Sequence, residues 1–266
     1  MKLNSAKEAF TEQSSIFDTT YSDSFITQYK RYRIRKVIDQ IKLPENSNIL
    51  ELNGGTGEDA IYFAKLGHTV HSTDLSEGML SQMRSKITTH NLEHQIKSSQ
   101  LDYHDLSSLQ GEKYDLIYSN FGGLNCTENL SQVLNQMPSL LNKNGKICLV
   151  IMPPCSLWEW LSLLKGNFRL AFRRLKKNGT PSHIEGKHFL SWYYTPKFIK
   201  QQLETHCREV LTEGLCLIAP PVHYEHHFFN KVKTFKFLCK LEEKICNIYP
   251  FNAMADYFIL VLEKKN

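Results

Sequence analysis

The pattern of apolar and polar positions changes in character along the chain. Residues 6–17 and 24–41 show helical periodicity, which ends before Pro44. From Asn48 to about Met152, short β-rich runs alternate with helical stretches. The expected strands are 48–52, 69–73, 96–101, 114–119 and 146–152, with helices at 59–66, 77–89 and 129–141. Alternation at this spacing predicts a parallel sheet with helices on both faces, joined by right-handed crossovers.

The remainder of the chain predicts two more strands and two additions to the sheet. Residues 153–190 interrupt the alternation and are expected to form a helical insertion. A helix at 196–205, a strand at 210–218, a helical segment at 229–248 and a strand at 256–262 follow. We therefore predict an α/β fold with a seven-stranded, mostly parallel sheet, and helical insertions after strands five and six. The expected units are an N-terminal helical cap (1–44), a core (45–152), a helical lid (153–194), and the rest of the core with an insertion at about 219–252 (195–266).

The composition is typical of a soluble globular protein. Hydrophobic residues are 41% and charged residues 22% of 266 residues, which excludes disorder and allows a full core. The longest apolar run, Ile147 to Met152, is too short to cross a bilayer. The N-terminus has no apolar signal-peptide region, and the seven cysteines include no Cys-x-x-Cys pair. These features predict a cytoplasmic protein with reduced thiols.

The basic residues are concentrated in one segment. Six of them and no acid lie between Lys165 and Lys177, and the net charge is +5 with these six and −1 without them. A nucleic-acid-binding protein is normally basic over a whole face, so a nucleic-acid partner is not expected. Residues 162–177 interleave the cations with large apolar side chains at helical spacing. We expect this segment to cover an apolar pocket; peripheral membrane contact and a lid helix on the core with a solvated basic face are alternatives.

A glycine-rich turn after the first strand is the strongest chemical signal. The strand ends at Leu52, the turn contains Gly54, Gly55 and Gly57, and a helix begins at Glu58. Glycines in such a turn adopt positive φ and let the backbone approach a nucleotide closely. Asp74, at the end of the second strand, can accept both hydroxyls of a ribose. Nicotinamide dinucleotides and S-adenosylmethionine both suit this arrangement, and an ordinary tight strand–helix turn is the third interpretation.

The two acids that begin the next helix favour one of these cofactors. A pyrophosphate would bind at the helix N-terminus, where Glu58 and Asp59 would repel it. S-adenosylmethionine has no phosphate and carries a sulfonium and an amino group, for which nearby acids are acceptable. The charges therefore favour the methyl donor.

In four places the sequence resembles the class I S-adenosylmethionine-dependent methyltransferases, which have a Rossmann-like fold. Glu51 to Gly57 matches the family's E-x-G-x-G-x-G turn, with Asn53 in place of the first glycine. Asn tolerates left-handed φ better than most residues, so the turn can survive. Asp74 to Leu80 matches D-x-S-x-x-M-L, Asp102 to Leu106 matches D-a-x-x-L, and Tyr114 to Phe121 matches the fourth strand.

The resemblance implies how the cofactor is held. The glycine turn would bind the methionine end, Asp74 the ribose and Asp102 the adenine amino group, and the end of the fourth strand would face the sulfonium. Leu75 and Met79 would flank the adenine. The implied cofactor-binding residues are Glu51, Asn53, Gly54, Gly55, Gly57, Asp74, Leu75, Met79, Asp102, Tyr103, Asn120 and Phe121.

The acceptor side of the site is less defined by the sequence. Residues 10–18 are similar to the F-D-x-x-A-x-x-Y-D pattern of the ubiquinone and menaquinone methyltransferases, with three positions altered. This resemblance implies a place near the acceptor, which we expect to be small and apolar or aromatic. The expected pocket residues are Phe17, Tyr21, Tyr29, Trp158, Phe168 and Phe172.

The predicted reaction is an in-line displacement at the sulfonium methyl group. Because the donor is already activated, holding the acceptor in line and excluding water can supply most of the catalysis, and no catalytic residue is assigned. Any of several histidines could act as a base, and no metal site is expected; the candidates are His183, His188, His223, His226 and His227. Two alternatives stay open. An NAD(P)-dependent oxidoreductase would leave Asp102 unexplained, and a non-catalytic S-adenosylmethionine-binding module would keep every cofactor residue.

Overall fold

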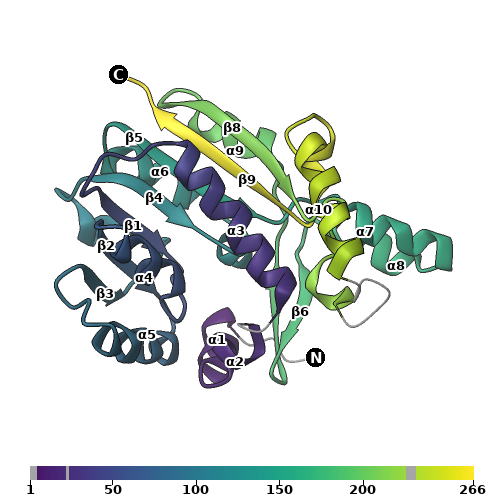
Figure 1. The fold of residues 1–266 in the computed structure, drawn as a ribbon, viewed down its shortest axis with the longest axis horizontal. Helices are drawn as coiled ribbons and strands as arrows, with labels where there is room; N and C mark the ends of the chain where they lie inside the picture. The colour runs from purple at the N-terminus through teal and green to yellow at the C-terminus, as the bar shows by residue number, and fades with distance from the viewer. Residues whose placement is uncertain (1–4, 22–23, 226–231) are drawn as a thin grey trace.

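The computed structural model describes residues 5–21, 24–225 and 232–266 and is built around a seven-stranded sheet (Figure 1). The strand order is β3-β2-β1-β4-β5-β9-β8. β1 to β5 are parallel, and β9 is antiparallel to both of its neighbours, β5 and β8. The strands are β1 (Asn48–Leu52), β2 (Thr69–Asp74), β3 (Ile96–Gln100), β4 (Tyr114–Ser119), β5 (Leu141–Ile151), β8 (Cys207–Leu215) and β9 (Tyr257–Lys264). The predicted seven-stranded, mostly parallel sheet is confirmed.

The order of the strands reverses between β1 and β4. From β1 the chain moves outward through β2 to β3, and it then returns to β4 on the other side of β1. Leu52 at the end of β1 is paired with Ser119 at the end of β4. Ligands of open α/β sheets bind at the carboxyl ends of the strands where the order reverses. The glycine turn and the end of the fourth strand therefore meet at this point.

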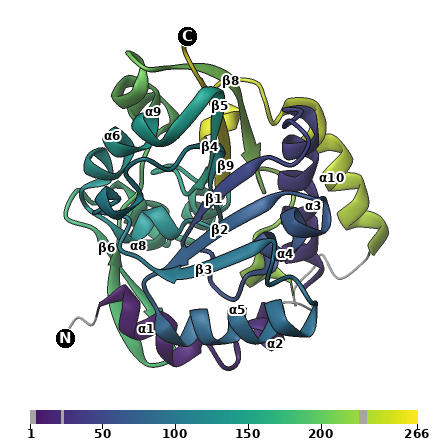
Figure 2. The ribbon, with the colours of Figure 1, turned by 90° about the vertical axis from the view of Figure 1, so that its left-hand side faces the viewer.

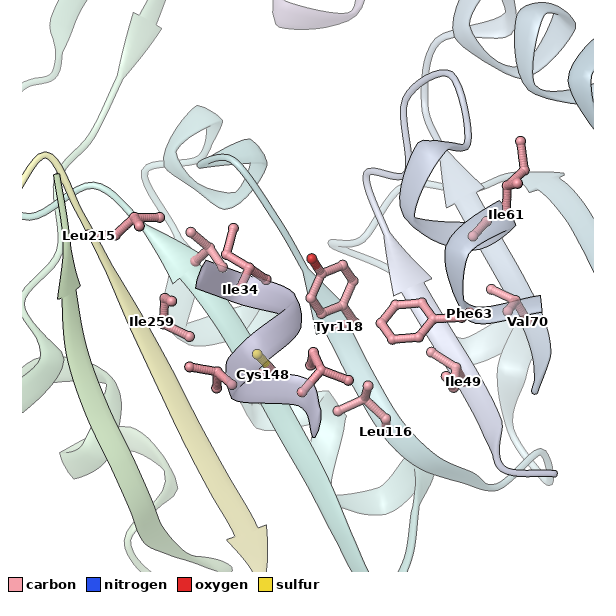
Figure 3. Packing of buried hydrophobic residues seen from close by; sticks show 14 of the residues in the cluster. Ile34, Ile49, Ile61, Phe63, Val70, Leu116, Tyr118, Cys148, Leu215 and Ile259 are labelled. Atoms are coloured by element: carbon pink, nitrogen blue, oxygen red, sulfur yellow. The ribbon is translucent and has the colours of Figure 1, made fainter. Parts of the chain in front are cut away.

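Helices cover both faces of the sheet and enclose two apolar cores. One face is covered by α3 (Phe25–Gln40), α4 (Glu58–Lys65), α5 (Glu77–Thr89) and α10 (Val232–Ile245), and the other by α6 (Leu130–Leu140) and α9 (Pro196–Leu203). Figure 3 shows the first core, where Ile34, Phe63 and Tyr118 are at most 1% exposed. At the start of α3, the side chain of Ser24 accepts from the backbone N–H of Thr27. Each core is formed by strand side chains on one face of the sheet and by the helix side chains that pack against that face.

Two short N-terminal helices lie across the carboxyl edge of the sheet. They are α1 (Ala6–Gln13) and α2 (Phe17–Tyr21), and Figure 2 shows α1 beside α5. A capping box between Ser5 and Glu8 begins α1. The hydroxyl of Thr11 lies 2.9 Å from that of Ser76 at the start of α5. These helices therefore lie against the segments that follow β1 and β2, through Asp18 with Thr56 and Thr11 with Ser76.

The insertion after β5 is helical only in its first half. It contains α7 (Leu157–Trp160), α8 (Phe168–Ala171) and 3₁₀ turns at Leu161–Lys165 and Arg173–Leu175. A hairpin of β6 (Thr180–Ile184) and β7 (Lys187–Ser191) follows, so the expectation of helix up to residue 194 is wrong for the hairpin. Glu185 and Gly186 connect the strands with φ of 44° and 75°. Positive φ at both loop residues is the geometry of a tight two-residue hairpin turn.

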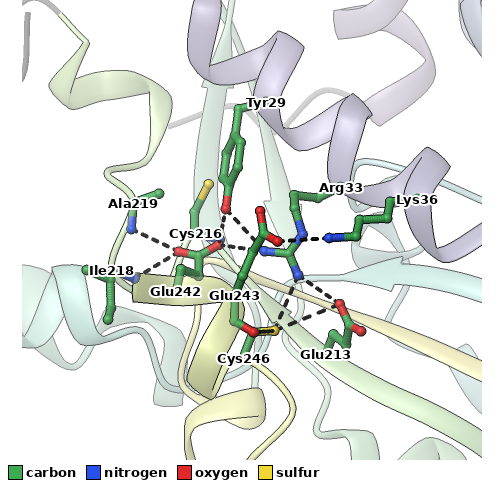
Figure 4. Close-up of polar contacts among 10 residues, drawn as sticks. All are labelled: Tyr29, Arg33, Lys36, Glu213, Cys216, Ile218, Ala219, Glu242, Glu243 and Cys246. Atoms are coloured by element: carbon green, nitrogen blue, oxygen red, sulfur yellow. Dashed lines mark hydrogen bonds and ion pairs between the residues drawn. The ribbon is translucent and has the colours of Figure 1, made fainter. Parts of the chain in front are cut away.

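The helix between β8 and β9 is anchored by a buried carboxylate. Glu242 of α10 is fully buried and accepts hydrogen bonds from the backbone N–H groups of Cys216, Ile218 and Ala219 at 2.9–3.1 Å (Figure 4). It also accepts from the hydroxyl of Tyr29 at 3.1 Å, which links α10 to α3. One side chain thus fixes both α10 and the loop that follows β8.

Two further features concern the helices and the cysteines. Among the described residues, no helix has both the length and the apolar character needed to cross a membrane. All seven cysteines of the chain are free thiols, five of them buried.

Candidate cofactor and acceptor site

The glycine turn after β1 requires its glycines for different reasons. At Gly54 an added Cβ would lie 2.1 Å from the hydroxyl oxygen of Ser72, so close packing excludes a side chain. Gly57 has φ of 83°, and a Cβ there would lie 2.6 Å from Met83 of α5. Gly55 has φ of 58°, but a Cβ there would contact nothing within 4 Å. The turn is therefore packed against the protein at Gly54 and Gly57, and it borders open space at Gly55.

Asp74 holds the glycine turn against the end of β2. Its carboxylate accepts from the backbone N–H groups of Gly55 at 2.9 Å and Ser76 at 2.8 Å. Burial raises the pKa of Asp74, and these backbone donors offset part of that effect. A carboxylate has about four acceptor positions, so it can accept further hydrogen bonds from a ligand's hydroxyl groups. Leu75 beside it is 36% exposed, whereas Met79 is buried beneath the turn.

A second carboxylate, Glu51, lies directly under the turn. It is 2% exposed and accepts a hydrogen bond from the hydroxyl of Ser72. Burial raises the pKa of Glu51, and the neighbouring Asp59 raises it further. A cationic ligand group near this carboxylate would lower its pKa again and favour the ionised form.

Asn53 connects the glycine turn with the end of β4. It has the left-handed conformation expected from the sequence, with φ of 51°. Its side-chain oxygen accepts from the Ser119 hydroxyl at 2.7 Å, and its amide donates to the carbonyl of Asn120 at 3.2 Å. The next residue, Phe121, has φ of 47°, which is unusual for a bulky side chain. Strained backbone of this kind is concentrated at functional sites.

The contact between Asn53 and Gly123 can be tested by substitution. A Cβ at Gly123 would lie 2.2 Å from the amide nitrogen of Asn53. We therefore expect Gly123→Ala to reduce the free energy of unfolding by about 1–3 kcal/mol, the usual effect of overpacking, and to weaken ligand binding at the turn. The double variant Asn53→Gly/Gly123→Ala should recover part of the loss, because glycine removes the clashing side chain and tolerates the same φ, although the hydrogen bonds of Asn53 to Ser119 and Asn120 are lost with it. Equal losses in the single and double variants, by urea unfolding, would contradict this contact.

The acids at the start of α4 are paired with cations. Glu58 forms an ion pair with Lys86 of α5 at 2.6 Å. Asp59 pairs with Arg31 of α3 at 2.9 Å and also accepts from the side chain of Asn120. Because both charges are compensated within the protein, the argument that they would repel a pyrophosphate is much weaker than the sequence suggested. The choice of cofactor must rest on other grounds.

Asp102 lies after β3, next to the end of β2. The backbone N–H of Leu101 donates to the carbonyl of Asp74, which brings the two acids to neighbouring strand ends. The Asp102 side chain is 48% exposed and accepts from the ring of His104 at 2.6 Å. Burial raises the pKa of Tyr103. The structure thus gathers the twelve expected cofactor-binding residues, from Glu51 to Phe121, at the carboxyl ends of β1 to β4 and the turns that follow them.

α2 lies against the glycine turn. The rings of Phe17 and Tyr21 are 4.9 Å apart. Between them, Asp18 accepts from the hydroxyl of Thr56 in the glycine turn at 2.7 Å and pairs with Lys86 at 2.6 Å. This contact of Asp18 with Thr56 and Lys86 was not predicted, although the resemblance at residues 10–18 implied that the segment lies near the acceptor.

Three expected pocket residues lie elsewhere. Tyr29 is 9% exposed, and its hydroxyl donates to Glu242 within the core, so it supports α10 and is not a pocket wall. Phe168 and Phe172 are 65% and 45% exposed and face solvent. Of the residues expected from the insertion, Trp158 packs against another aromatic ring, with its centroid 5.2 Å from that of Tyr224.

A buried ion network lies at the start of β9. Asp256 pairs with Lys30 at 3.2 Å and with Arg174 at 2.7 Å, and Arg174 also pairs with Glu159 of α7. Burial alone would raise the pKa of Asp256, but the two cations outweigh it and lower the pKa to about 2. Sequence reasoning missed this network because it grouped Arg173 and Arg174 with the other four cations of residues 165–177, and nothing in the sequence marks Asp256 and Glu159 as their partners.

The candidate histidines lie in separate places. His223 follows β8, and partial desolvation lowers its pKa. His183 and His188 face each other on the hairpin, with ring centroids 4.7 Å apart. His226 and His227 lie outside the described residues. In the described part of the chain, no group of three side chains is arranged to hold a metal ion.

Comparisons with known proteins agree with this geometry. Residues 49–145 match the family model of the methyltransferase domain. An S-adenosylmethionine-dependent methyltransferase from Clostridium acetobutylicum is 14% identical over 97% of this chain and 99% of that chain, with a TM-score of 0.59. The 1,6-didemethyltoxoflavin-N1-methyltransferase of Burkholderia thailandensis, solved with 1,6-didemethyltoxoflavin and S-adenosylhomocysteine, is 13% identical over 98% of this chain and 87% of that chain, with a TM-score of 0.58. The [4+2]-cyclase SpnF is 11% identical over 99% of this chain and 98% of that chain, with a TM-score of 0.61.

These likenesses show a match to the methyltransferase domain over residues 49–145 and a common fold over almost the whole chain. The matched residues run from β1 into the turn within β5 and include the glycine turn, Asp74 and the end of β4. At identities of 11–14%, the solved structures show a common fold and leave the acceptor open. The chain therefore has the Rossmann-like fold of class I S-adenosylmethionine-dependent methyltransferases.

Proposed function

We propose that this protein transfers the methyl group of S-adenosylmethionine to a small, largely apolar or aromatic acceptor. The observation that carries the proposal is the glycine turn of the methyltransferase domain, which is fixed by Asp74 and borders open space at Gly55. The residues fit the cofactor: Asp74 has free acceptor positions for ribose hydroxyls, and the exposed carboxylate of Asp102 is available to the adenine amino group.

The cofactor supplies an activated methyl group when it is bound. The chain's own residues would then bind the cofactor, orient the acceptor and exclude water from the site. Asn53 holds the end of β4 against the glycine turn, and Asp18 holds α2 over the same turn. Orientation of an acceptor in line, in a site shielded from water, can supply most of the rate enhancement for such a transfer.

The nature of the acceptor is inferred from the resemblance of residues 10–18 to the quinone methyltransferases and from the aromatic side chains nearby. Phe17 and Tyr21 of α2 lie beside the glycine turn, and Phe10 of α1 packs against Phe189 of the hairpin, with ring centroids 5.9 Å apart. Rings of this kind favour a flat apolar acceptor. Seven free cysteines favour a reducing compartment, so we also infer a cytoplasmic location.

The two other functions considered have less support. An NAD(P)-dependent oxidoreductase would share the glycine turn and Asp74, but the match to the methyltransferase domain does not favour it. A binding module without activity would keep the same cofactor residues, and it is separated from an enzyme only by an assay of methyl transfer.

The proposal is tested by adding the protein and S-adenosylmethionine with a labelled methyl group to a small-molecule extract of the source cells. We expect the label to appear in a product that partitions into an organic solvent, and not to appear with the Asp74→Ala variant. Label that enters only protein or nucleic acid would contradict a small acceptor. Absence of any labelled product, with normal binding of S-adenosylhomocysteine, would favour the binding module.

A further inference from the structure

The first half of the insertion after β5 presents large apolar side chains to solvent. We call residues 161–177 the α8 tip; Figure 1 shows α7 and α8 projecting from the body of the protein. Five large apolar residues of the tip are exposed: Leu161 (43%), Leu164 (86%), Phe168 (65%), Phe172 (45%) and Leu175 (49%). Apolar side chains gathered at a surface in this way mark an interaction site more often than isolated ones do.

The exposed charged side chains of the α8 tip are all basic. Lys165, Arg169, Lys176 and Lys177 are exposed, and the sequence has no Asp or Glu between Trp160 and Ile184. The two other cations of the segment, Arg173 and Arg174, are paired with Glu159. The outer surface of the tip therefore combines five apolar side chains with four unit positive charges.

The base of the α8 tip is held firmly. Arg174 is 5% exposed and donates to the carboxylate and the carbonyl of Asp256 at 2.7 and 3.0 Å. Arg173 makes two hydrogen bonds to Glu159 at 2.7 and 2.9 Å. The two arginines therefore anchor the base of the tip to Asp256, which precedes β9, and to Glu159 of α7. These contacts fix the position from which the apolar side chains of the tip extend into solvent.

We infer that the α8 tip attaches this protein to a membrane surface that carries anionic lipids. Apolar side chains flanked by cations are the composition of elements that insert into the headgroup region of a bilayer. A second copy of the chain is a poorer occupant, because a symmetric interface would place four positive charges against four others. The same segment was expected from the sequence to cover the acceptor pocket; its exposure makes surface attachment the better interpretation. This inference does not depend on the proposed function.

The test is flotation of the full-length protein with vesicles of phosphatidylcholine alone or with 30% phosphatidylglycerol. We expect binding to the anionic vesicles only, and weaker binding as salt rises. Each cation near such a surface raises partitioning about fivefold, so Lys176→Gln/Lys177→Gln should lower it about 25-fold. Leu164→Ser/Phe168→Ser should lower it at least tenfold. Both variants should keep the wild-type unfolding midpoint, because none of the four side chains is buried.

Matched controls lie outside the tip. Tyr249 is 81% exposed, and Lys65 and Lys143 are exposed near the amino ends of β2 and β5. Tyr249→Ser and Lys65→Gln/Lys143→Gln should bind anionic vesicles within twofold of the wild type. Absence of wild-type binding, or equal losses in the controls and the tip variants, would overturn the inference. So would a wild-type dimer in vesicle-free buffer that Leu164→Ser/Phe168→Ser converts to a monomer.

Discussion

Replacement of Glu242 with alanine is expected to lower the free energy of unfolding by about 3–5 kcal/mol, the usual effect of breaking a buried charged network. The carboxylate accepts three backbone N–H groups and the Tyr29 hydroxyl, and it lies 3.6 Å from the guanidinium of Arg33. Alanine would leave those donors buried without an acceptor. Urea unfolding, with the slope of the transition compared between variants, measures the change.

The neighbouring residue provides the control. Glu243 pairs with Lys36 at 2.8 Å, but both side chains are partly exposed, at 33% and 42%. Glu243→Ala should therefore change the free energy of unfolding by less than about 1 kcal/mol. Glu242→Gln keeps the volume but places an amide N–H₂ among donors, so it should still be clearly destabilised. A loss at Glu242 no larger than that at Glu243 would mean that the network does not hold α10.

The second large effect is expected on binding. Asp74→Ala should weaken the binding of S-adenosylhomocysteine at least tenfold, because hydrogen bonds to charged groups contribute about 1.5–3 kcal/mol each and 1.4 kcal/mol corresponds to a factor of ten. The substitution would also release the N–H groups of Gly55 and Ser76 that the carboxylate now holds. Isothermal titration calorimetry measures the affinity.

A smaller loss is expected at the next acid. Asp102 is 48% exposed and already accepts from His104, so its contact with a ligand competes with water. Asp102→Ala should weaken binding by less than Asp74→Ala, with both variants folded by circular dichroism. Unchanged affinity in Asp74→Ala would mean that the end of β2 does not contact the cofactor.

The sheet could be predicted from the sequence because its signals are local. β1, β4 and β5 contain apolar runs that end in turns, β2 and β3 are short segments between helical stretches, and the glycine turn and Asp74 are separated by a single helix and strand. Asn53 was correctly expected to keep a left-handed turn. These features depend on φ preferences and on the period of apolar positions, which a single sequence displays directly.

The features that could not be predicted depend on partners far apart in the chain. Tyr29 was expected to line the acceptor pocket, because the sequence alone does not show that Glu242, 213 residues later, accepts a hydrogen bond from its hydroxyl. In the sequence, Arg174 cannot be told from the five other cations of the segment. In the structure it is buried and forms ion pairs with Asp256 and Glu159. The hairpin had a local signal, Glu185-Gly186 between two short β-rich runs, and the helical interpretation of residues 153–194 overlooked it.

The glycine turn, with Asp74 and Asp102, is proposed to bind S-adenosylmethionine. Calorimetric titration of the full-length protein with S-adenosylhomocysteine, and separately with NAD and NADP, distinguishes the cofactors. We expect saturable binding of S-adenosylhomocysteine that Asp74→Ala weakens at least tenfold, and no binding of either dinucleotide. Binding of NAD or NADP with no response to S-adenosylhomocysteine would contradict it.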